Sequence, residues 1–175
     1  QNGDHLLAAQ SYQRISEAFP EDTLAPTALY QAGYEYSRMW RKPELDTQYG
    51  THAQNTLNTL FALYPDSKYE DEAKALMAKI NNMFAVKDFK TGYSYFRRHA
   101  YDSAIIYFKD VIRLHPDTPA ARDAYLYLYE SYRKINYRDD AAETCQAMRT
   151  LYPDDKEVRE KCGSGSSAEA STPPT

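Results

Sequence analysis

One pattern of small and apolar residues occurs four times in this sequence, each time with the same internal spacing. One copy is Ala104, Phe108, Val111 and Pro116, with offsets of four, seven and twelve from its first residue. The other copies are Ala8, Tyr12, Ile15, Pro20; Ala53, Leu57, Leu60, Pro65; and Ala141, Cys145, Met148, Pro153. Offsets of four and seven place three side chains on one stripe of a helix, and a proline five residues later ends it. Each copy is therefore predicted to be the second helix of a helical pair.

The spacing around these copies indicates a repeat with a fixed length. Tyr132, Tyr129 and Tyr125 precede Ala141 by nine, twelve and sixteen residues, and Tyr95 and Gly92 precede Ala104 by nine and twelve. Residues 85–118 and 122–155 then form two 34-residue units, the period of the tetratricopeptide repeat. An ordinary helical bundle is the alternative, but it would not keep the proline in register four times. The sequence predicts an all-α solenoid of antiparallel helix pairs with one long connecting helix.

Helical periodicity extends over most of the chain. The predicted helices cover residues 5–19, 24–39, 51–64, 67–98, 101–115, 118–135 and 138–152, and a frayed turn is expected at 155–161. The inward residues of the first are predicted to be Leu6, Leu7, Tyr12, Ile15 and Phe19, and Thr23 is the predicted cap of the second. Between residues 67 and 98 there is no proline and only Gly92, which predicts one continuous helix of roughly 45 Å. Asn81 and Asn82 are the expected place for a bend.

The sequence predicts a truncated first repeat at one end of the chain and a disordered tail at the other. Because the chain opens inside a repeat, without that repeat's first helix, we expect a fragment whose tetratricopeptide domain covers residues 1–161 with a truncated first repeat. Residues 162–175 include GSGSSAEASTPPT, which is poor in apolar residues and predicts a disordered tail. No run of eighteen apolar residues occurs that could span a membrane.

Composition narrows the function classes. A net charge of -4 and a pI near 5.6 argue against nucleic-acid binding, which usually needs a basic surface. Seventeen tyrosines suit helix grooves that contact other proteins, although most can also be packing residues of the repeats. The two cysteines leave two interpretations open. In the first, Cys145 is a small buried side chain at a core position and Cys162 lies where the last helix should fray. In the second, the two cysteines form a disulfide in an oxidising compartment.

The second copy departs from the repeat period through the segment WRKPELDTQYG, residues 40–50. A connection of this length is too long for a tight turn between helices, so it is either a functional loop or a tolerated surface insertion. Trp40, Arg41 and Lys42 are the residues of this loop that we expect to contact a partner.

No pattern of metal ligands or catalytic residues occurs in the sequence. The four histidines are far apart, there is no CxxC or HExxH, and no glycine-rich phosphate loop precedes a helix. We therefore predict a protein that is not an enzyme and needs no cofactor or metal. One basic cluster, YFRRH at residues 95–99, either complements the end of the long helix or forms an aromatic and arginine hot spot for an acidic partner. Either interpretation requires Arg97 and Arg98 to be exposed.

With the repeats in place, the chain resembles the BamD family of outer-membrane assembly factors, which are periplasmic lipoproteins built of tetratricopeptide repeats. The likeness extends over most of residues 8–155. It depends on PELDTQ in the loop, on LYPDSKYEDEAKALM at the entry to the long helix, and on YSYFRRHAYDSAI and HPDTPAARDAY at the following junctions. The order of these segments is more specific than any single repeat match.

The resemblance implies a scaffold subunit of the machinery that folds β-barrel proteins into the outer membrane, held at the periplasmic face by a lipid anchor that this chain lacks. It would dock the periplasmic domains of the barrel component BamA, contact other machinery subunits and help to receive unfolded substrates. For the barrel component it nominates Arg97, Arg98, Tyr101, Tyr107 and Lys109. For the groove, generally lined by the first helix of each pair, it nominates Tyr30, Tyr34, Arg38, Phe89, Tyr93, Phe96, Arg97, Leu126, Glu130 and Arg133. The alternative is a soluble adaptor that binds extended peptides or cell-envelope enzymes in the same groove.

Overall fold

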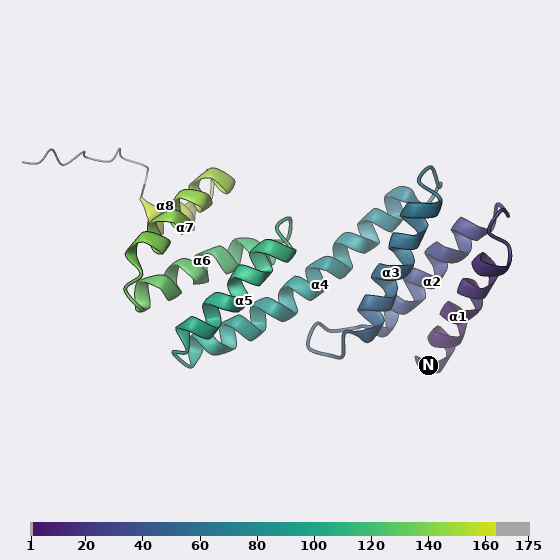
Figure 1. Ribbon diagram of the computed structural model, residues 1–175, viewed down its shortest axis with the longest axis horizontal. Helices are drawn as coiled ribbons and strands as arrows, with labels where there is room; N and C mark the ends of the chain where they lie inside the picture. Colours follow the sequence, from purple (N-terminus) through teal and green to yellow (C-terminus); the bar gives the residue numbers. More distant parts are fainter. Residues whose placement is uncertain (1, 164–175) are drawn as a thin grey trace, which may run out of the picture. The chain divides into compact units, whose positions relative to one another are not determined.

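The computed structural model describes residues 2–163, and all regular structure in this range is helical (Figure 1). Within this described range, eight helices follow one another with short connections. They are α1 Asn2–Ala18, α2 Ala25–Met39, α3 Gln48–Leu63, α4 Glu70–Arg97, α5 Tyr101–Leu114, α6 Pro119–Lys134, α7 Arg138–Leu151 and α8 Lys156–Cys162. Helices adjacent in sequence pack together, which confirms the predicted all-α, tetratricopeptide-like class.

Three of the four repeated stripes face the core. Ala53, Leu57 and Leu60 of α3 are fully buried, as are Ala104, Phe108 and Val111 of α5. In α7, Ala141, Cys145 and Met148 are also buried. Pro65, Pro116 and Pro153 follow the ends of these helices, as the missing N–H of proline requires.

The first stripe is less buried than predicted. Leu7, Ile15 and Phe19 are 67%, 41% and 62% exposed, so the prediction that they point inward is wrong. Among the described residues α1 packs chiefly on α2, and one covering helix can bury only one side of it. The cap prediction for Thr23 is also wrong, because Leu24 is at the N-cap position of α2 and no side chain of the described residues caps this helix.

The chain divides into two compact units, one up to Lys87 and one from Asp88 onward. The core of the first unit joins α1, α2, α3 and the beginning of α4. Gly33 in α2 allows close approach of α3, because a Cβ at this position would lie 2.9 Å from Leu57 Cδ2. In the second unit Gly92 has the same role, since its Cβ would lie 2.9 Å from Phe108 Cε1.

The predicted long helix is confirmed as α4, a single helix of 28 residues that continues through Asn81 and Asn82. After it the chain turns at His99, whose φ is 62°. Asn136, between α6 and α7, has a φ of 61° at the equivalent position of the next repeat. A helix often ends at a residue in the left-handed region, where glycine has the least steric conflict. Asparagine tolerates this backbone conformation better than most other residues.

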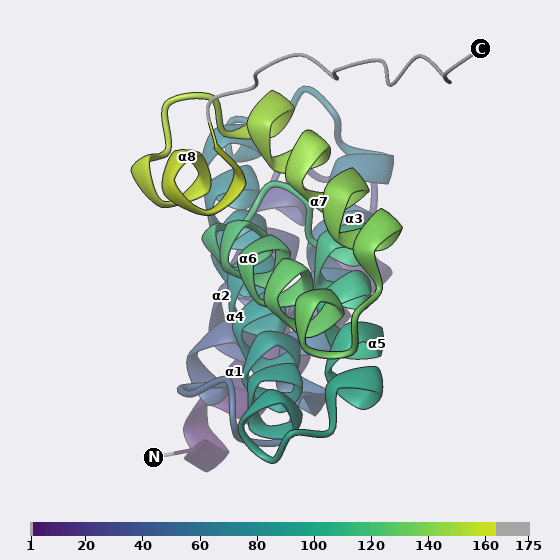
Figure 2. The ribbon, with the colours of Figure 1, turned by 90° about the vertical axis from the view of Figure 1, so that its left-hand side faces the viewer.

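The end of the second unit is more ordered than expected. The predicted frayed turn is the helix α8, which lies beside α6 and α7 (Figure 2). Asp155 caps it, accepting hydrogen bonds from the N–H groups of Glu157 and Val158 at 2.9 and 3.1 Å. Arg122 of α6 donates to both carboxylate oxygens of Asp155 at 2.9 Å, which fixes the cap to the preceding pair.

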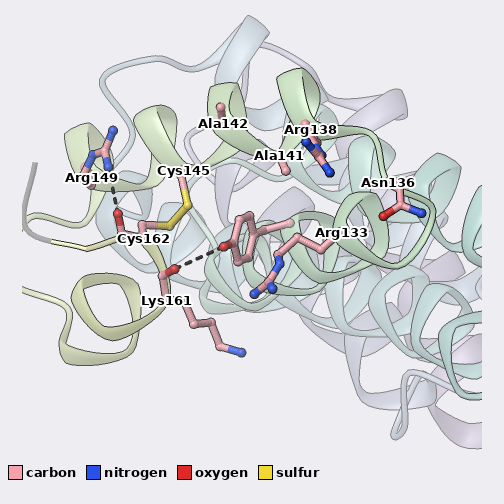
Figure 3. A pocket seen from close by; sticks show the side chains of 10 residues that line it. Arg133, Asn136, Arg138, Ala141, Ala142, Cys145, Arg149, Lys161 and Cys162 are labelled. Carbon is pink, nitrogen blue, oxygen red and sulfur yellow. Dashed lines mark hydrogen bonds between the residues drawn. A yellow bond between two sulfur atoms is a disulfide. The ribbon is translucent and has the colours of Figure 1, made fainter. Parts of the chain in front are cut away.

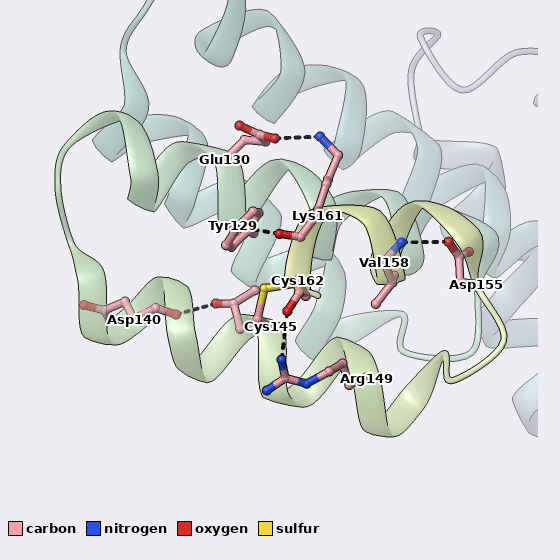
Figure 4. Close-up of a disulfide and its surroundings, with 10 residues drawn as sticks. Tyr129, Glu130, Asp140, Cys145, Arg149, Asp155, Val158, Lys161 and Cys162 are labelled. Atoms are coloured by element: carbon pink, nitrogen blue, oxygen red, sulfur yellow. Dashed lines mark hydrogen bonds and ion pairs between the residues drawn. A yellow bond between two sulfur atoms is a disulfide. The ribbon is translucent and has the colours of Figure 1, made fainter. Parts of the chain in front are cut away.

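Cys145 and Cys162 form a disulfide with a Cα–Cα distance of 5.5 Å (Figure 4). The sequence left two interpretations open, and the structure shows the disulfide. Cys162 is the last residue of the ordered helix α8 and does not lie in a frayed end. Burial of Val158 against α6 and α7 brings α8 close enough for this bond. The rest of the predicted tail, residues 164–175, lies outside the described residues.

Candidate partner-binding surfaces

An aromatic cluster connects α4 to α6 in the second unit. Phe89, Tyr93 and Phe96 occupy one stripe of α4, and all three contact Tyr127 of α6 with ring centroids 5.7, 5.0 and 5.2 Å away. We call these four residues the Tyr127 cluster. All four are only partly buried, and burial, followed by the neighbouring Tyr93, raises the pKa of the Tyr127 hydroxyl. The cluster therefore combines ring surface with hydroxyl groups, as protein-binding surfaces often do.

A cavity of about 210 Å³ lies at the edge of this cluster. It contains three of the predicted groove residues, Phe96, Leu126 and Glu130, together with Tyr127, Glu157 and Lys161. Lys161 Nζ lies 2.6 Å from Glu130 Oε1, so α8 contributes charge to the groove. Sequence reasoning missed Tyr127 and α8. The signal for Tyr127 was its position three residues before Glu130, on the same face of α6.

In the first unit, stacked tyrosines connect α2 to the start of α4. The rings of Tyr30 and Tyr69 are parallel within 9° with centroids 4.9 Å apart, and Tyr34 follows at 6.4 Å from Tyr30. The Arg38 guanidinium lies 5.8 Å from the Tyr34 ring centroid. The predicted groove residues of α2 therefore form one continuous surface with Tyr69, which the sequence analysis did not single out.

The five residues predicted to dock the barrel component are not all in contact. Arg97, Arg98 and Lys109 are exposed, which confirms the expected exposure of the two arginines. Tyr107 stacks on Tyr95 with centroids 5.4 Å apart, and Tyr101 meets Phe96 at the same distance. Tyr101 thus connects this basic end of α4 to the Tyr127 cluster.

The prediction that Trp40 of the loop contacts a partner is wrong. Its side chain is only 2% exposed and packs on Phe84 with ring centroids 4.4 Å apart. A connection of eight residues then separates α2 from α3, because Gln48 to Gly50 are already helical. The indole fills the space over Gly50, so it belongs to the core and not to a contact surface. Arg41 and Lys42 are exposed.

Residues 2–163 contain neither a candidate metal site nor a candidate membrane-spanning helix. No group of three or more histidine, cysteine, aspartate or glutamate side chains in this range could hold a metal ion. In the same range, no helix has both the length and the apolar character needed to cross a membrane.

Paired helices with aromatic and charged faces define a helical-repeat protein of the tetratricopeptide type, the class that binds other proteins along its surface. The sequence matches the family model for YfiO, an outer membrane lipoprotein, over residues 1–148. The chain belongs to this family.

Curated relatives carry a more specific name. The chain is 26% identical over 163 residues to the outer membrane protein assembly factor BamD of Xylella fastidiosa strain Temecula1, covering 87% of this chain and 56% of the relative. It is 25% identical over 158 residues to BamD of Vibrio cholerae, with coverages of 85% and 66%, and 23% identical over 158 residues to BamD of Caulobacter vibrioides, with coverages of 87% and 52%. The chain thus spans between half and two thirds of the length of these relatives.

Proposed function

We propose that this chain is part of a scaffold subunit of the machinery that assembles β-barrel proteins into the outer membrane, and that it acts without catalysis. The observation that carries the proposal is the family match over residues 1–148, together with relatives named as outer membrane protein assembly factors. Exposed aromatic and arginine side chains on paired helices support a binding role.

We assign the two kinds of partner to different units. Arg97, Arg98, Tyr101, Tyr107 and Lys109 of the second unit dock the periplasmic domains of a BamA-like barrel component. Stacked tyrosines and Arg38 of the first unit bind unfolded outer-membrane protein substrates. An extended chain can use such a groove because tyrosine rings offer apolar area and a hydroxyl at low entropic cost.

The proposed location is the periplasmic face of the outer membrane, with a lipid anchor in the full-length protein. The family description as an outer membrane lipoprotein supports this. The disulfide between Cys145 and Cys162 also supports it, because such bonds persist in the periplasm and are rare in the cytosol.

Co-purification tests the proposal. The full-length protein, tagged and extracted from membranes with detergent, is expected to bring down an outer-membrane barrel protein, and the Arg97→Glu/Arg98→Glu variant is expected to lose it. Arg14→Glu serves as the control, because Arg14 is exposed, lies in the other unit and is assigned to no partner. Recovery of the wild-type protein in a soluble fraction with no barrel partner would favour the adaptor role instead.

A further inference from the structure

A hollow of about 550 Å³ opens between α6, α7 and α8, away from the residues assigned above to the barrel component (Figure 3). Four of its lining side chains are cationic: Arg133, Arg138, Arg149 and Lys161. Among residues 2–163, no aspartate or glutamate lines it. We call it the basic hollow.

Most of this positive charge is not neutralised by neighbouring groups. Lys161 pairs with Glu130, whereas Arg149 donates to the carbonyl oxygen of Cys162 at 3.0 Å. Arg133 lies 5.8 Å from the ring centroid of Tyr129. Within residues 2–163, no carboxylate forms an ion pair with Arg133, Arg138 or Arg149. Three guanidinium groups thus line this hollow, Arg149 at one end and Arg133 and Arg138 towards the other (Figure 3), on a chain whose net charge is -4.

Helix stability does not explain all of them. Arg133 lies in the last turn of α6, where a cation favours the helix dipole. Arg138 is the first residue of α7, where the same dipole disfavours a cation. Its position therefore needs another reason, and a bound anion would supply one.

The walls of the basic hollow are held in place by α8. The disulfide joins Cys162 to α7, and the Tyr129 hydroxyl donates to the carbonyl oxygen of Lys161 at 3.2 Å. Arg149 adds its hydrogen bond to Cys162 from the other side (Figure 4). A site fixed in this way loses little conformational entropy when a ligand binds.

We propose that the basic hollow binds the carboxylates of an acidic segment of a partner polypeptide. Guanidinium groups bind carboxylates through two parallel hydrogen bonds, and the volume accommodates more than one side chain. A single lipid headgroup is a poorer fit, because Arg138 and Arg149 are eleven residues apart on α7. At a rise of about 1.5 Å per residue this is roughly 16 Å, a distance that several carboxylates of one extended chain can span. The proposal does not depend on the role in outer-membrane assembly.

Fluorescence anisotropy with a short rhodamine-labelled peptide of alternating glutamate and serine tests this site on the whole chain. We expect the wild-type protein to bind this peptide at least about tenfold more tightly than its glutamine analogue. Arg133→Gln/Arg138→Gln should lower the affinity about tenfold, and Arg138→Lys should recover only part of the loss from Arg138→Gln, because an ammonium lacks the planar fork.

The matched control is Arg113→Gln, which removes an exposed arginine from α5 of the same unit and should leave the affinity unchanged. Equal binding of the two peptides, or full affinity in the double variant with an unchanged circular dichroism spectrum, would overturn the proposal. Tighter binding to phosphatidylglycerol vesicles or inorganic phosphate would reject the polypeptide ligand.

Discussion

Because Gly50 has no side chain, the backbone of α3 can pack closely against the indole of Trp40. A Cβ on this residue would lie 2.2 Å from Trp40 Cε3 and 2.5 Å from Cζ3, inside any real contact distance. Gly50→Ala is therefore expected to lower the free energy of unfolding by about 1–3 kcal/mol, although alanine favours a helix over glycine by up to about 1 kcal/mol. Urea denaturation followed by circular dichroism measures the change.

Gly3 provides the control for this substitution, since nothing lies within 4 Å of a Cβ placed on it in α1. Gly3→Ala should leave stability unchanged or raise it by up to about 1 kcal/mol. If Gly50→Ala behaved like Gly3→Ala, the close packing of Trp40 on α3 would be wrong.

Residues such as Trp40 mark the limit of what the sequence could predict. The buried stripe of Ala104, Phe108 and Val111 was predictable because helical periodicity is a local property. Trp40 stands in an irregular connection without periodicity, and its partners Phe84 and Gly50 lie elsewhere in the chain. Tyr127 had a local signal, its position three residues before Glu130, but only tertiary contacts show that its ring meets three side chains of α4.

The helix α8 is attached to its unit by two devices, of which the first is the cap at Asp155. The hydrogen bonds from Arg122, followed by that from the Val158 N–H, lower the pKa of Asp155 from 3.8 to about 2. Because the folded-state pKa is depressed, this contribution to stability is present above pH 3.8 and is lost as the pH falls towards 2.

Asp155→Asn tests this linkage. The variant should be less stable than the wild-type protein by on the order of 1 kcal/mol at pH 7, and the difference should shrink as the pH falls through the range of 4 to 2. Urea denaturation across this pH range measures it. Asp154→Asn, on the exposed neighbour, should show no such convergence, and a pH-independent difference for Asp155→Asn would contradict the charged pairing with Arg122.

The second device is the disulfide, which closes a segment with a sequence separation of 17. A loop of this length corresponds to about 3 kcal/mol of stabilisation. A reducing agent is therefore expected to lower the thermal midpoint of the wild-type protein, measured by circular dichroism. Since the chain has only two cysteines, the Cys145→Ser/Cys162→Ser variant should start at the lower midpoint and be insensitive to the reductant. A wild-type midpoint unaffected by reduction would contradict a stabilising bond.

Among the helices too, those set by local sequence could be predicted, and those that depend on tertiary contacts could not. The boundaries of α4 to α7 followed from periodicity and from prolines, which act within one turn. Whether α8 forms could not be predicted, because a helix of 7 residues is unstable alone and depends on Arg122, Val158 and the disulfide. The same contacts also create the basic hollow, so this site had no separate sequence signal.

At the scale of the whole molecule, the two units present different chemistry. The first carries stacked tyrosines with Arg38, and the second carries the basic end of α4 beside the Tyr127 cluster. If the proposed division of partners is right, substitutions in one unit should affect one partner and leave the other unchanged, because coupling energies between sites without shared contacts are usually small.

This separation can be measured with purified periplasmic domains of the barrel component and with an unfolded outer-membrane protein peptide. Arg97→Glu/Arg98→Glu should weaken binding of the domains about tenfold or more, because charge reversal turns attraction to an acidic surface into repulsion, while affinity for the unfolded peptide stays the same. Tyr34→Ala/Arg38→Gln should do the reverse, because it removes an exposed ring and the cation beside it. All four side chains are at least partly exposed, so neither variant should unfold the protein. If either variant weakened both interactions equally at unchanged stability, the two partners would share one surface, and the assignment of one partner to each unit would be wrong.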